Sequence, residues 1–150
     1  MKDSGELRKL IRDLLAGQPL AVLSTHGEEG AHASLVAFAV TEDLSQVLLA
    51  TPRATRKFAN LASDPRVALL VDNRSNRESD FHEAAAATVF GSAEEVPETE
   101  RERSLALYLR RHAHLKDFVA SPTTALLRVG VEKYSVVTRF QQVMELRICR

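Results

Sequence analysis

Apolar residues near the start of the chain recur every three or four positions, which is the spacing of one face of an α-helix. Ser4 is a candidate cap in front of this pattern, and Gly17 followed by Pro19 marks its end. We therefore predict an N-terminal helix within residues 1–17 that packs its apolar face on the rest of the chain. That face consists of Leu7, Leu10, Ile11, Leu14 and Leu15.

From Leu20 onward the apolar residues alternate with a period of two or form short continuous runs, and both patterns are typical of β-strands. The connectors between the runs are short, which favours antiparallel hairpins. Gly91 indicates a bulge or a close approach of two backbones, and Gly130 is interpreted as the joint between the last two runs. The predicted strands are 20–25, 31–41, 46–51, 66–72, 84–95, 123–129 and 133–148.

Two further helices interrupt the strands, at residues 54–61 and 98–111. Acidic residues near the start of the second helix and basic residues at its end agree with the helix dipole. Residues 73–80 are polar, and we expect a mobile loop. Its Arg74 and Arg77 could close over a ligand, although a solvated loop is the simpler interpretation. The expected inward-facing residues are Phe58 and Leu61 in the first helix, and Leu105, Tyr108 and Leu109 in the second.

Six or more strands, mostly linked by hairpins and decorated by short helices, predict a mainly β fold. The expected architecture is a small antiparallel barrel with added helices. No internal repeat, low-complexity segment or linker divides the 150 residues. We therefore expect residues 1–150 to form a single domain.

Composition excludes several classes of protein. Lys plus Arg and Asp plus Glu each number 20, so the formal net charge is zero and the chain lacks the basic field of a nucleic-acid-binding protein. No apolar run approaches the roughly 20 residues of a membrane helix, and the charged N-terminus has no signal-peptide core. The single cysteine, Cys149, excludes an intrachain disulfide and a cysteine-built zinc site. We expect a cytoplasmic protein without nucleic-acid or membrane partners, in which Cys149 has no special role.

The segment from Leu48 to Lys57 is the most informative for chemistry, because a strand there leads into the start of a helix. The first turn carries a hydroxyl, Thr55, and two cations, Arg56 and Lys57. Backbone N–H groups at a helix start attract anions, and a guanidinium can hold two phosphate oxygens. Cations at this end oppose the helix dipole, and a bound anion would offset that effect. The pattern predicts a phosphate site, with an ordinary solvated helix surface as the alternative.

The five histidines give a weaker signal. His112 and His114 follow the second helix, and a solvated loop pair is favoured over a metal site. A metal would need further ligands, recruited from Asp117 or His82. His32 lies in the second strand and is either a pocket residue or a structural one. No metal site is predicted, and no phosphate-binding loop, nucleophile elbow or dinucleotide fingerprint is present.

Several short motifs follow one another along the chain at residues 33–38, 50–51, 55–57, 60–61, 64–70, 87–93 and 137–143. Their order and spacing resemble the pyridoxamine 5'-phosphate oxidase-like, FMN-binding split-barrel superfamily. Residues 33–38 look like its flavin-facing strand, and 87–93 like its long strand. Residues 137–143 are similar to the C-terminal strand of its haem-utilisation branch. The resemblance covers about residues 19–142, nearly the whole chain.

The resemblance implies a split β-barrel that forms a homodimer with FMN at the subunit interface. Arg56 and Lys57 would hold the FMN phosphate, while Thr51 and Thr55 would donate hydroxyl hydrogen bonds. Main-chain groups at 36–38 would run beneath the edge of the flavin ring. The implied cofactor-binding residues are Val36, Ala37, Phe38, Ala50, Thr51, Thr55, Arg56 and Lys57.

The chain also departs from the true pyridoxamine-phosphate oxidases. Those enzymes have a basic residue at each end of the flavin-facing strand, where this chain has Leu35 and Val40. Their glutamine before the long strand is replaced around Ala86, and their C-terminal tryptophan has no counterpart in a chain without Trp. The haem-degrading branch has a C-terminal histidine, and no histidine follows His114. The chain therefore resembles the haem-utilisation or general flavoprotein branch rather than vitamin B6 oxidases.

The expected function is that of an FMN-dependent oxidoreductase acting on an unassigned small-molecule substrate or electron donor. Hydride or electron transfer is favoured, because no general acid or base stands out beside the flavin-facing strand. No catalytic residue is assigned. One alternative is a haem-binding or haem-degrading protein on the same scaffold, with His32, His112 or His114 as ligand. Another is a non-catalytic dimer that binds FMN or the deazaflavin F420.

Overall fold

The computed structural model describes residues 4–148 and confirms the N-terminal helix. Helix α1 (Ser4–Ala16) ends where the Gly17 N–H donates a hydrogen bond to the Asp13 carbonyl at 3.0 Å. Cys149 lies outside the described residues. The buried face of α1 joins the main core through Leu7, Ile11, Leu14 and Leu15.

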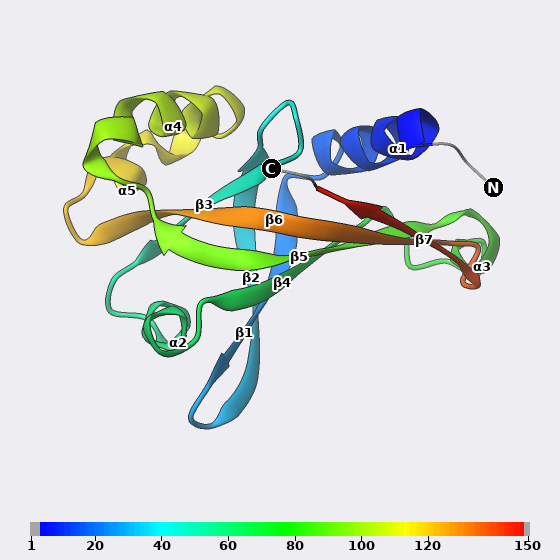
Figure 1. Ribbon diagram of the computed structural model, residues 1–150, viewed down its shortest axis with the longest axis horizontal. Coiled ribbons are helices and arrows are strands. Elements are labelled where there is room, and N and C mark those ends of the chain that lie inside the picture. Colours follow the sequence, from blue (N-terminus) through cyan, green and yellow to red (C-terminus); the bar gives the residue numbers. More distant parts are fainter. Residues whose placement is uncertain (1–3, 149–150) are drawn as a thin grey trace.

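Within residues 4–148, seven strands form one antiparallel sheet in the order β3-β2-β1-β4-β5-β6-β7. Strand β3 also pairs with β6, so six strands close into a barrel and β7 extends the sheet from β6 (Figure 1). The predicted mainly β, antiparallel barrel is therefore confirmed. The strands are β1 (Leu20–Gly27), β2 (Gly30–Val40), β3 (Gln46–Pro52), β4 (Arg66–Asp72), β5 (Ala85–Glu95), β6 (Thr124–Thr138) and β7 (Gln142–Arg147).

Two helices besides α1 were predicted, and both are present as α2 (Arg56–Ser63) and α4 (Glu98–Arg111). The sequence pattern did not predict the short helices α3 (Asp80–Glu83), η1 (Ala113–Leu115) and α5 (Lys116–Ala120). These elements have three to five residues each, which is too short for a helical period to show. Helices α4 and α5 lie together beyond one end of the long β5–β6 ribbon, with α2 below them in the view of Figure 1.

Gly91 has the role that its position inside a strand run predicted. The register between β5 and β6 shifts between Phe90 and Gly91, which is the mark of a bulge. A Cβ added at Gly91 would lie 2.2 Å from the Gly130 carbonyl oxygen, so no side chain fits between the two backbones. Gly130 was expected to separate two strands, and that prediction is wrong. It lies inside the continuous strand β6, where its carbonyl oxygen faces Gly91 across the bulge.

Apolar side chains form two clusters, one inside the barrel and one outside it. The inner cluster combines aliphatic residues of every strand with Phe38 and Tyr134, whose hydroxyl donates to the Leu44 carbonyl at 2.8 Å. The outer cluster lies between the barrel wall and helices α4 and α5. It contains Ala39, Leu48, Ala50, Val96, Tyr108, Val119 and Leu126.

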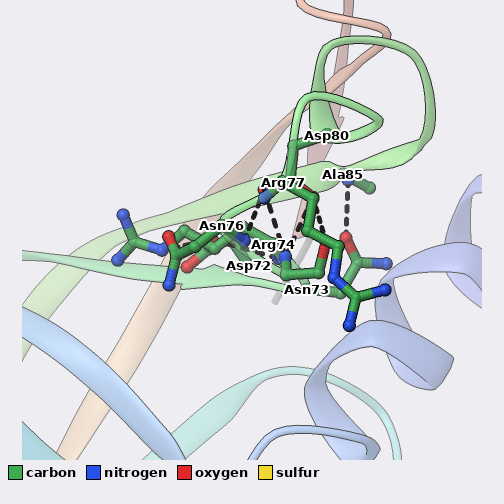
Figure 2. A network of polar contacts seen from close by, with 8 residues as sticks. Asp72, Asn73, Arg74, Asn76, Arg77, Asp80 and Ala85 are labelled. Carbon is green, nitrogen blue, oxygen red and sulfur yellow. Dashed lines mark hydrogen bonds and ion pairs between the residues drawn. The ribbon is translucent and has the colours of Figure 1, made fainter.

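The polar loop between β4 and β5 is organised around the carboxylate of Asp80. The backbone N–H groups of Ser75, Asn76 and Arg77 donate to that carboxylate at 2.8–3.3 Å, as does the Ser75 hydroxyl (Figure 2). These hydrogen bonds hold the pKa of Asp80 below its ordinary value, and the Ser75 N–H has the largest effect. Asn73 closes the base of the loop by accepting from the Ala85 N–H at 2.8 Å. The loop expected to be mobile therefore has a defined internal framework.

Candidate functional site

The predicted phosphate site lies where β3 leads into α2. Thr55 caps the helix, since its hydroxyl oxygen accepts from the Phe58 N–H at 3.2 Å and its O–H donates to the Pro52 carbonyl at 2.9 Å. Thr51 has no exposed surface, and its hydroxyl lies 3.1 Å from that of Thr55. The two hydroxyls thus fix the turn that delivers the chain to the start of α2. The N–H groups of the first helical turn that are left without intrahelical partners remain available to an anion.

Arg56 and Lys57 follow this cap directly. The Arg56 Nη1 lies 2.5 Å from the Glu29 carboxylate, which belongs to the turn of the β1–β2 hairpin. Both side chains are more than half exposed, so water screens the pair and it contributes little to stability. Sequence reasoning missed Glu29, because the hairpin turn and α2 are brought together only by the fold. The start of α2 therefore carries two cations, one of which already has a carboxylate partner.

A hollow of about 370 Å³ lies between the hairpin and α2, lined by Glu29, Gly30, Ala31, His32, Arg56 and Asn60. The Nδ1 atom of His32 is buried and has no hydrogen-bond partner among the described residues. This places His32 in a pocket, which was one of the two interpretations of the sequence. Asn60 is buried and donates to the Thr25 hydroxyl at 3.1 Å, which ties α2 to β1. A Cβ on Gly27 would lie 2.0 Å from the Asn60 Oδ1, so this contact requires glycine.

The second group of predicted residues lies on β2, next to β3 in the sheet. Phe38 pairs with Leu49, so the segment 36–38 and the segment 50–51 occupy neighbouring strands. The side chains of Val36 and Phe38 point into the barrel core, whereas Ala37 packs outside against the cluster under α4. Ala50 is buried in the same outer cluster. The structure thus brings the predicted residues of β2 and β3 together along one part of the barrel wall.

Helix α4 holds the main chain of this part of β2. The Tyr108 hydroxyl donates to the Ala37 carbonyl at 3.2 Å, and the Nε2 of His112 lies 2.7 Å from the Phe38 carbonyl oxygen. Burial raises the pKa of Tyr108 to about 12. The Arg111 guanidinium lies 4.8 Å from the centre of the Phe38 ring and donates to carbonyls at the end of α1, those of Leu15 and Gln18 among them.

The expectation that His112 and His114 form a solvated pair is wrong for His112. His112 is 3% exposed and packs with its ring 5.1 Å from that of Tyr108. It lies at the end of α4, where docking of the helix on β2 buries it, and this long-range contact leaves no local signal. His114 is exposed, as expected. Because the Nε2 of His112 is engaged by a carbonyl, this ring is a structural element of the α4 contact.

An uncovered apolar row crosses the outside of the barrel on β2, β1 and β4. Val22 pairs with Leu35 on one side and with Leu70 on the other, so the three side chains lie in line on the same face. Leu35 is 67% exposed and Leu70 is 36% exposed. We call this row, together with Leu20 at its edge, the bare face. Contiguous exposed apolar surface of this kind is typical of a surface that another molecule covers.

Two classes of feature are not found in the described part of the chain. Among residues 4–148 there is no group of three or more His, Cys, Asp or Glu side chains that could hold a metal ion. None of the helices in that range is both long and apolar enough to span a bilayer. The candidate site consists of the start of α2, the neighbouring parts of β2 and β3, and the bare face.

Comparison with known protein families adds a decisive observation, since the profile of the pyridoxamine 5'-phosphate oxidase family matches residues 7–138. The chain belongs to this family. The family match covers both segments of the candidate site and the bare face. A search of curated proteins finds none that matches the chain.

Several solved structures share the fold of this chain. A heme binding protein from Mycobacterium smegmatis superposes with a TM-score of 0.84 at 20% identity, covering 98% of this chain and 59% of that one. Campylobacter jejuni ChuZ gives 0.82 at 12% identity, with coverages of 98% and 61%. A fad-binding protein from Mesorhizobium loti gives 0.68 at 15% identity, with coverages of 85% and 90%. The chain thus spans about three fifths of the first two proteins, and at these identities the likeness concerns the fold.

Proposed function

We propose that this family member is an FMN-binding flavoprotein, a homodimeric oxidoreductase that acts on a small molecule. The observation that carries the proposal is the start of α2, where a hydroxyl-capped turn presents Arg56 and Lys57 beside N–H groups of the first helical turn. The donor set fits a phosphate monoester, because it combines two cations with backbone N–H groups. Membership of a flavin-associated family of oxidases supports the same assignment.

In this proposal Arg56 and Lys57 bind the FMN phosphate. The Thr51–Thr55 hydroxyl pair, expected from the resemblance to donate to the phosphate, instead holds the turn, because the Thr55 O–H donates to the Pro52 carbonyl and Thr51 has no exposed surface. A phosphate that arrives at Arg56 competes with the Glu29 carboxylate, which lies 2.5 Å from that guanidinium. The main chain of Val36, Ala37 and Phe38, beside Ala50, forms the wall for the flavin ring. The hydrogen bonds of Tyr108 and His112 to the Ala37 and Phe38 carbonyls keep this main chain in place.

The redox chemistry belongs to the flavin, which supplies hydride or electron transfer when it is bound. The protein's part is to hold the phosphate, to orient the ring against β2 and to exclude water from one of its faces. Val36, Ala37, Phe38 and Ala50 carry no titratable side chain, so this wall does not supply a general acid or base. This composition favours hydride or electron transfer over hydrolysis.

The bare face supports the homodimer. Leu35, Val22 and Leu70 form an apolar row without a helix over it. A second copy that presents the same row can bury both rows in a two-fold contact, which is the commonest arrangement of soluble homo-oligomers. In such a dimer, the partner subunit would also contribute surface that contacts the flavin.

Titration of FMN into the purified protein, followed by flavin absorption and fluorescence, tests the assignment. The double variant Arg56→Ala/Lys57→Ala removes two charged partners of the phosphate, each worth about 1.5–3 kcal/mol. We therefore expect the dissociation constant to rise about a hundredfold or more. The control Lys9→Ala/Arg12→Ala removes the same charge from the exposed face of α1 and should leave FMN binding unchanged. Equal FMN affinity in the double variant and the wild type would contradict the phosphate assignment.

Haem binding is a second candidate, favoured by the pocket position of His32 with its unpartnered Nδ1. The structural likeness to a protein described as a heme binding protein is consistent with it. The same titration with haemin, followed by the Soret band, distinguishes the two. A Soret band that is lost in His32→Ala, together with no uptake of FMN, would put haem first. Uptake of F420 in place of FMN would retain the phosphate site and change the cofactor.

A further inference from the structure

A second cavity is lined by residues of the β4–β5 loop with α3 and of the β6–β7 turn. These elements lie at the end of the barrel opposite α2 (Figure 1). It has a volume of about 640 Å³, which is within the range of small-molecule sites. Leu70, Val137 and the alanines at 84–86 form its floor, and Phe81 and Phe140 form one side. We call it the Phe81–Phe140 pocket.

The two phenylalanines form an aromatic platform. Their ring centres are 4.8 Å apart and the planes are inclined by 17°, so the rings stack. Phe81 is nevertheless 57% exposed and Phe140 is 63% exposed. Two large aromatic rings left this open beside a cavity are unusual in a folded chain, and they offer flat apolar surface to a ligand.

The backbone at Phe140 adopts a strained conformation, and this conformation sets the position of the ring. Arg139 has φ 51° and Phe140 has φ 64°, a left-handed conformation that bulky residues rarely adopt. Glycine or asparagine would satisfy the turn with less strain. Strained residues of this kind concentrate at ligand sites, so the turn is a second observation that points to a function for Phe140.

Two guanidinium groups border the same cavity. Arg74 is linked to Asp72 through its Nε at 3.0 Å, and its terminal nitrogens have no acceptor among the described residues. The side chain of Arg77 likewise has no hydrogen-bond acceptor within residues 4–148, while its backbone N–H is held by Asp80 (Figure 2). The hydrogen bonds of the loop thus fix the backbone of both arginines and leave guanidinium N–H groups of each available to a ligand.

The carboxylates around the cavity are mostly engaged. Asp72 is paired with Arg74, and the Asp80 oxygens accept from the loop backbone. Glu78 is the remaining acidic residue of the lining, and it is exposed. The free hydrogen-bonding groups of the pocket are therefore mainly donors. Such a site favours an anionic edge on its ligand.

We propose that the Phe81–Phe140 pocket binds a planar aromatic carboxylate. The ring system stacks on the two phenylalanines above the apolar floor, and the carboxylate is held by Arg74 and Arg77. The lining contains no histidine, cysteine, methionine or tyrosine, which are the usual protein ligands of haem iron, so the proposed recognition concerns the ring system and the carboxylate. Bicyclic acids and tetrapyrrole carboxylates share this chemistry, and the cavity volume admits ligands of several fused rings. The lining shares no residue with the hollow beside α2, and its floor meets the bare face at Leu70.

Fluorescence titration with 2-naphthoic acid and with protoporphyrin IX tests the pocket, and haemin is compared with the metal-free porphyrin. Phe81→Ser/Phe140→Ser should weaken binding of the recognised probe at least tenfold, and Arg74→Ala/Arg77→Ala should weaken it by a similar factor. Phe81→Leu/Phe140→Leu keeps the apolar volume and removes the ring faces, and it should also lose most of the affinity. All these side chains are exposed, so circular dichroism and the thermal midpoint should match those of the wild type.

The matched controls are Val143→Ser and Arg147→Ala, which alter an exposed apolar residue and an exposed arginine on β7 outside the lining. Both should bind the probe as the wild type does. Tighter binding of protoporphyrin than of naphthoate assigns the pocket to tetrapyrroles, and the reverse assigns it to smaller acids. The proposal is overturned if neither probe binds, if the phenylalanine variants retain full affinity, or if haemin binds far more tightly than the metal-free porphyrin.

Discussion

Two parts of the barrel's outer surface carry apolar side chains, and the chain covers only one of them within the described residues. Over β3, β6 and the end of β2, helices α4 and α5 bury the outer cluster around Leu48, Ala50 and Leu126. Over β1, β4 and the first half of β2 no helix lies on the row of Leu35, Val22 and Leu70. The change occurs inside one strand, because Leu35 is 67% exposed while Ala37, on the same side of β2, packs under α4.

The difference shows that outward-facing apolar residues of the same strands can be covered in two ways, by helices of the same chain or by another molecule. In the covered part, the side chains of Tyr108 and His112 form hydrogen bonds with main-chain carbonyls of β2. The bare face offers an apolar row flanked by small residues such as Ala33 and Ala68. We interpret the covered part as the internal support of the flavin wall and the bare face as the surface for a second copy. Three predictions separate the two roles.

The largest effect is expected from breaking the covered part. Tyr108 is 1% exposed, and Tyr108→Ala leaves a cavity under α4 and removes the hydrogen bond to Ala37. A large aromatic residue truncated in a core costs about 3–5 kcal/mol of the free energy of unfolding. Urea unfolding followed by circular dichroism measures it. Val143→Ala, at an exposed position on β7, should change the same quantity by no more than about 0.5 kcal/mol. Equal stability of Tyr108→Ala and the wild type would contradict the packing described for α4.

An intermediate effect is expected from placing a charge on the bare face. Leu35→Asp should leave the fold intact, because Leu35 is 67% exposed in the subunit. In a two-fold dimer the substitution would bring an unpaired carboxylate into each copy of the contact, and an uncompensated charge of this kind typically costs several kcal/mol. Analytical ultracentrifugation should show a dimer for the wild type and a monomer for the variant. Val143→Asp is the control and should remain dimeric. A monomeric wild type would remove the proposed interface.

The smallest effect is expected from Tyr108→Phe, which keeps the ring under α4 and deletes its hydroxyl. Loss of one hydrogen bond costs about 0.5–1.5 kcal/mol at neutral pH. Burial raises the pKa of Tyr108 from 10.0 to about 12, so its stabilising contribution is complete below pH 10 and is lost as the pH rises toward 12. Both tyrosines of the chain are buried, and burial also raises the pKa of Tyr134. An alkaline titration of tyrosinate absorbance should therefore show no phenol ionising near pH 10 while the chain is folded. Normal titration of one tyrosine in the folded protein would contradict the burial of Tyr108.

Local patterns were sufficient for most of the secondary structure. The strand predicted at 66–72 has these bounds in the structure, and the helix at 98–111 also agrees. Gly91 was interpreted correctly from its position inside a strand run. Gly130 was interpreted wrongly, because a glycine that ends a strand and a glycine that faces another backbone look the same in sequence. The pairing of β5 with β6 decides between them.

The candidate site shows the same division between local and long-range information. The cap at Thr55 and the cations that follow it could be predicted, because all of them lie in one turn. Glu29 beside Arg56 and the burial of His112 depend on contacts between distant segments, so no local pattern predicts them. The pocket beside Phe81 and Phe140 likewise exists only when the β4–β5 loop meets the β6–β7 turn.

The pairing of β6 with both β3 and β5 sets the order in which the chain can be completed during synthesis. Until Thr124–Thr138 has left the ribosome, β3 and β5 both present unpaired edges, and the outer cluster lacks Leu126. Open edges invite pairing with other chains. Strand β6 therefore closes the barrel by pairing with both of these edges. A nascent chain that stalls before β6 would be an open sheet with two unpaired edges, and such edges are prone to aggregation.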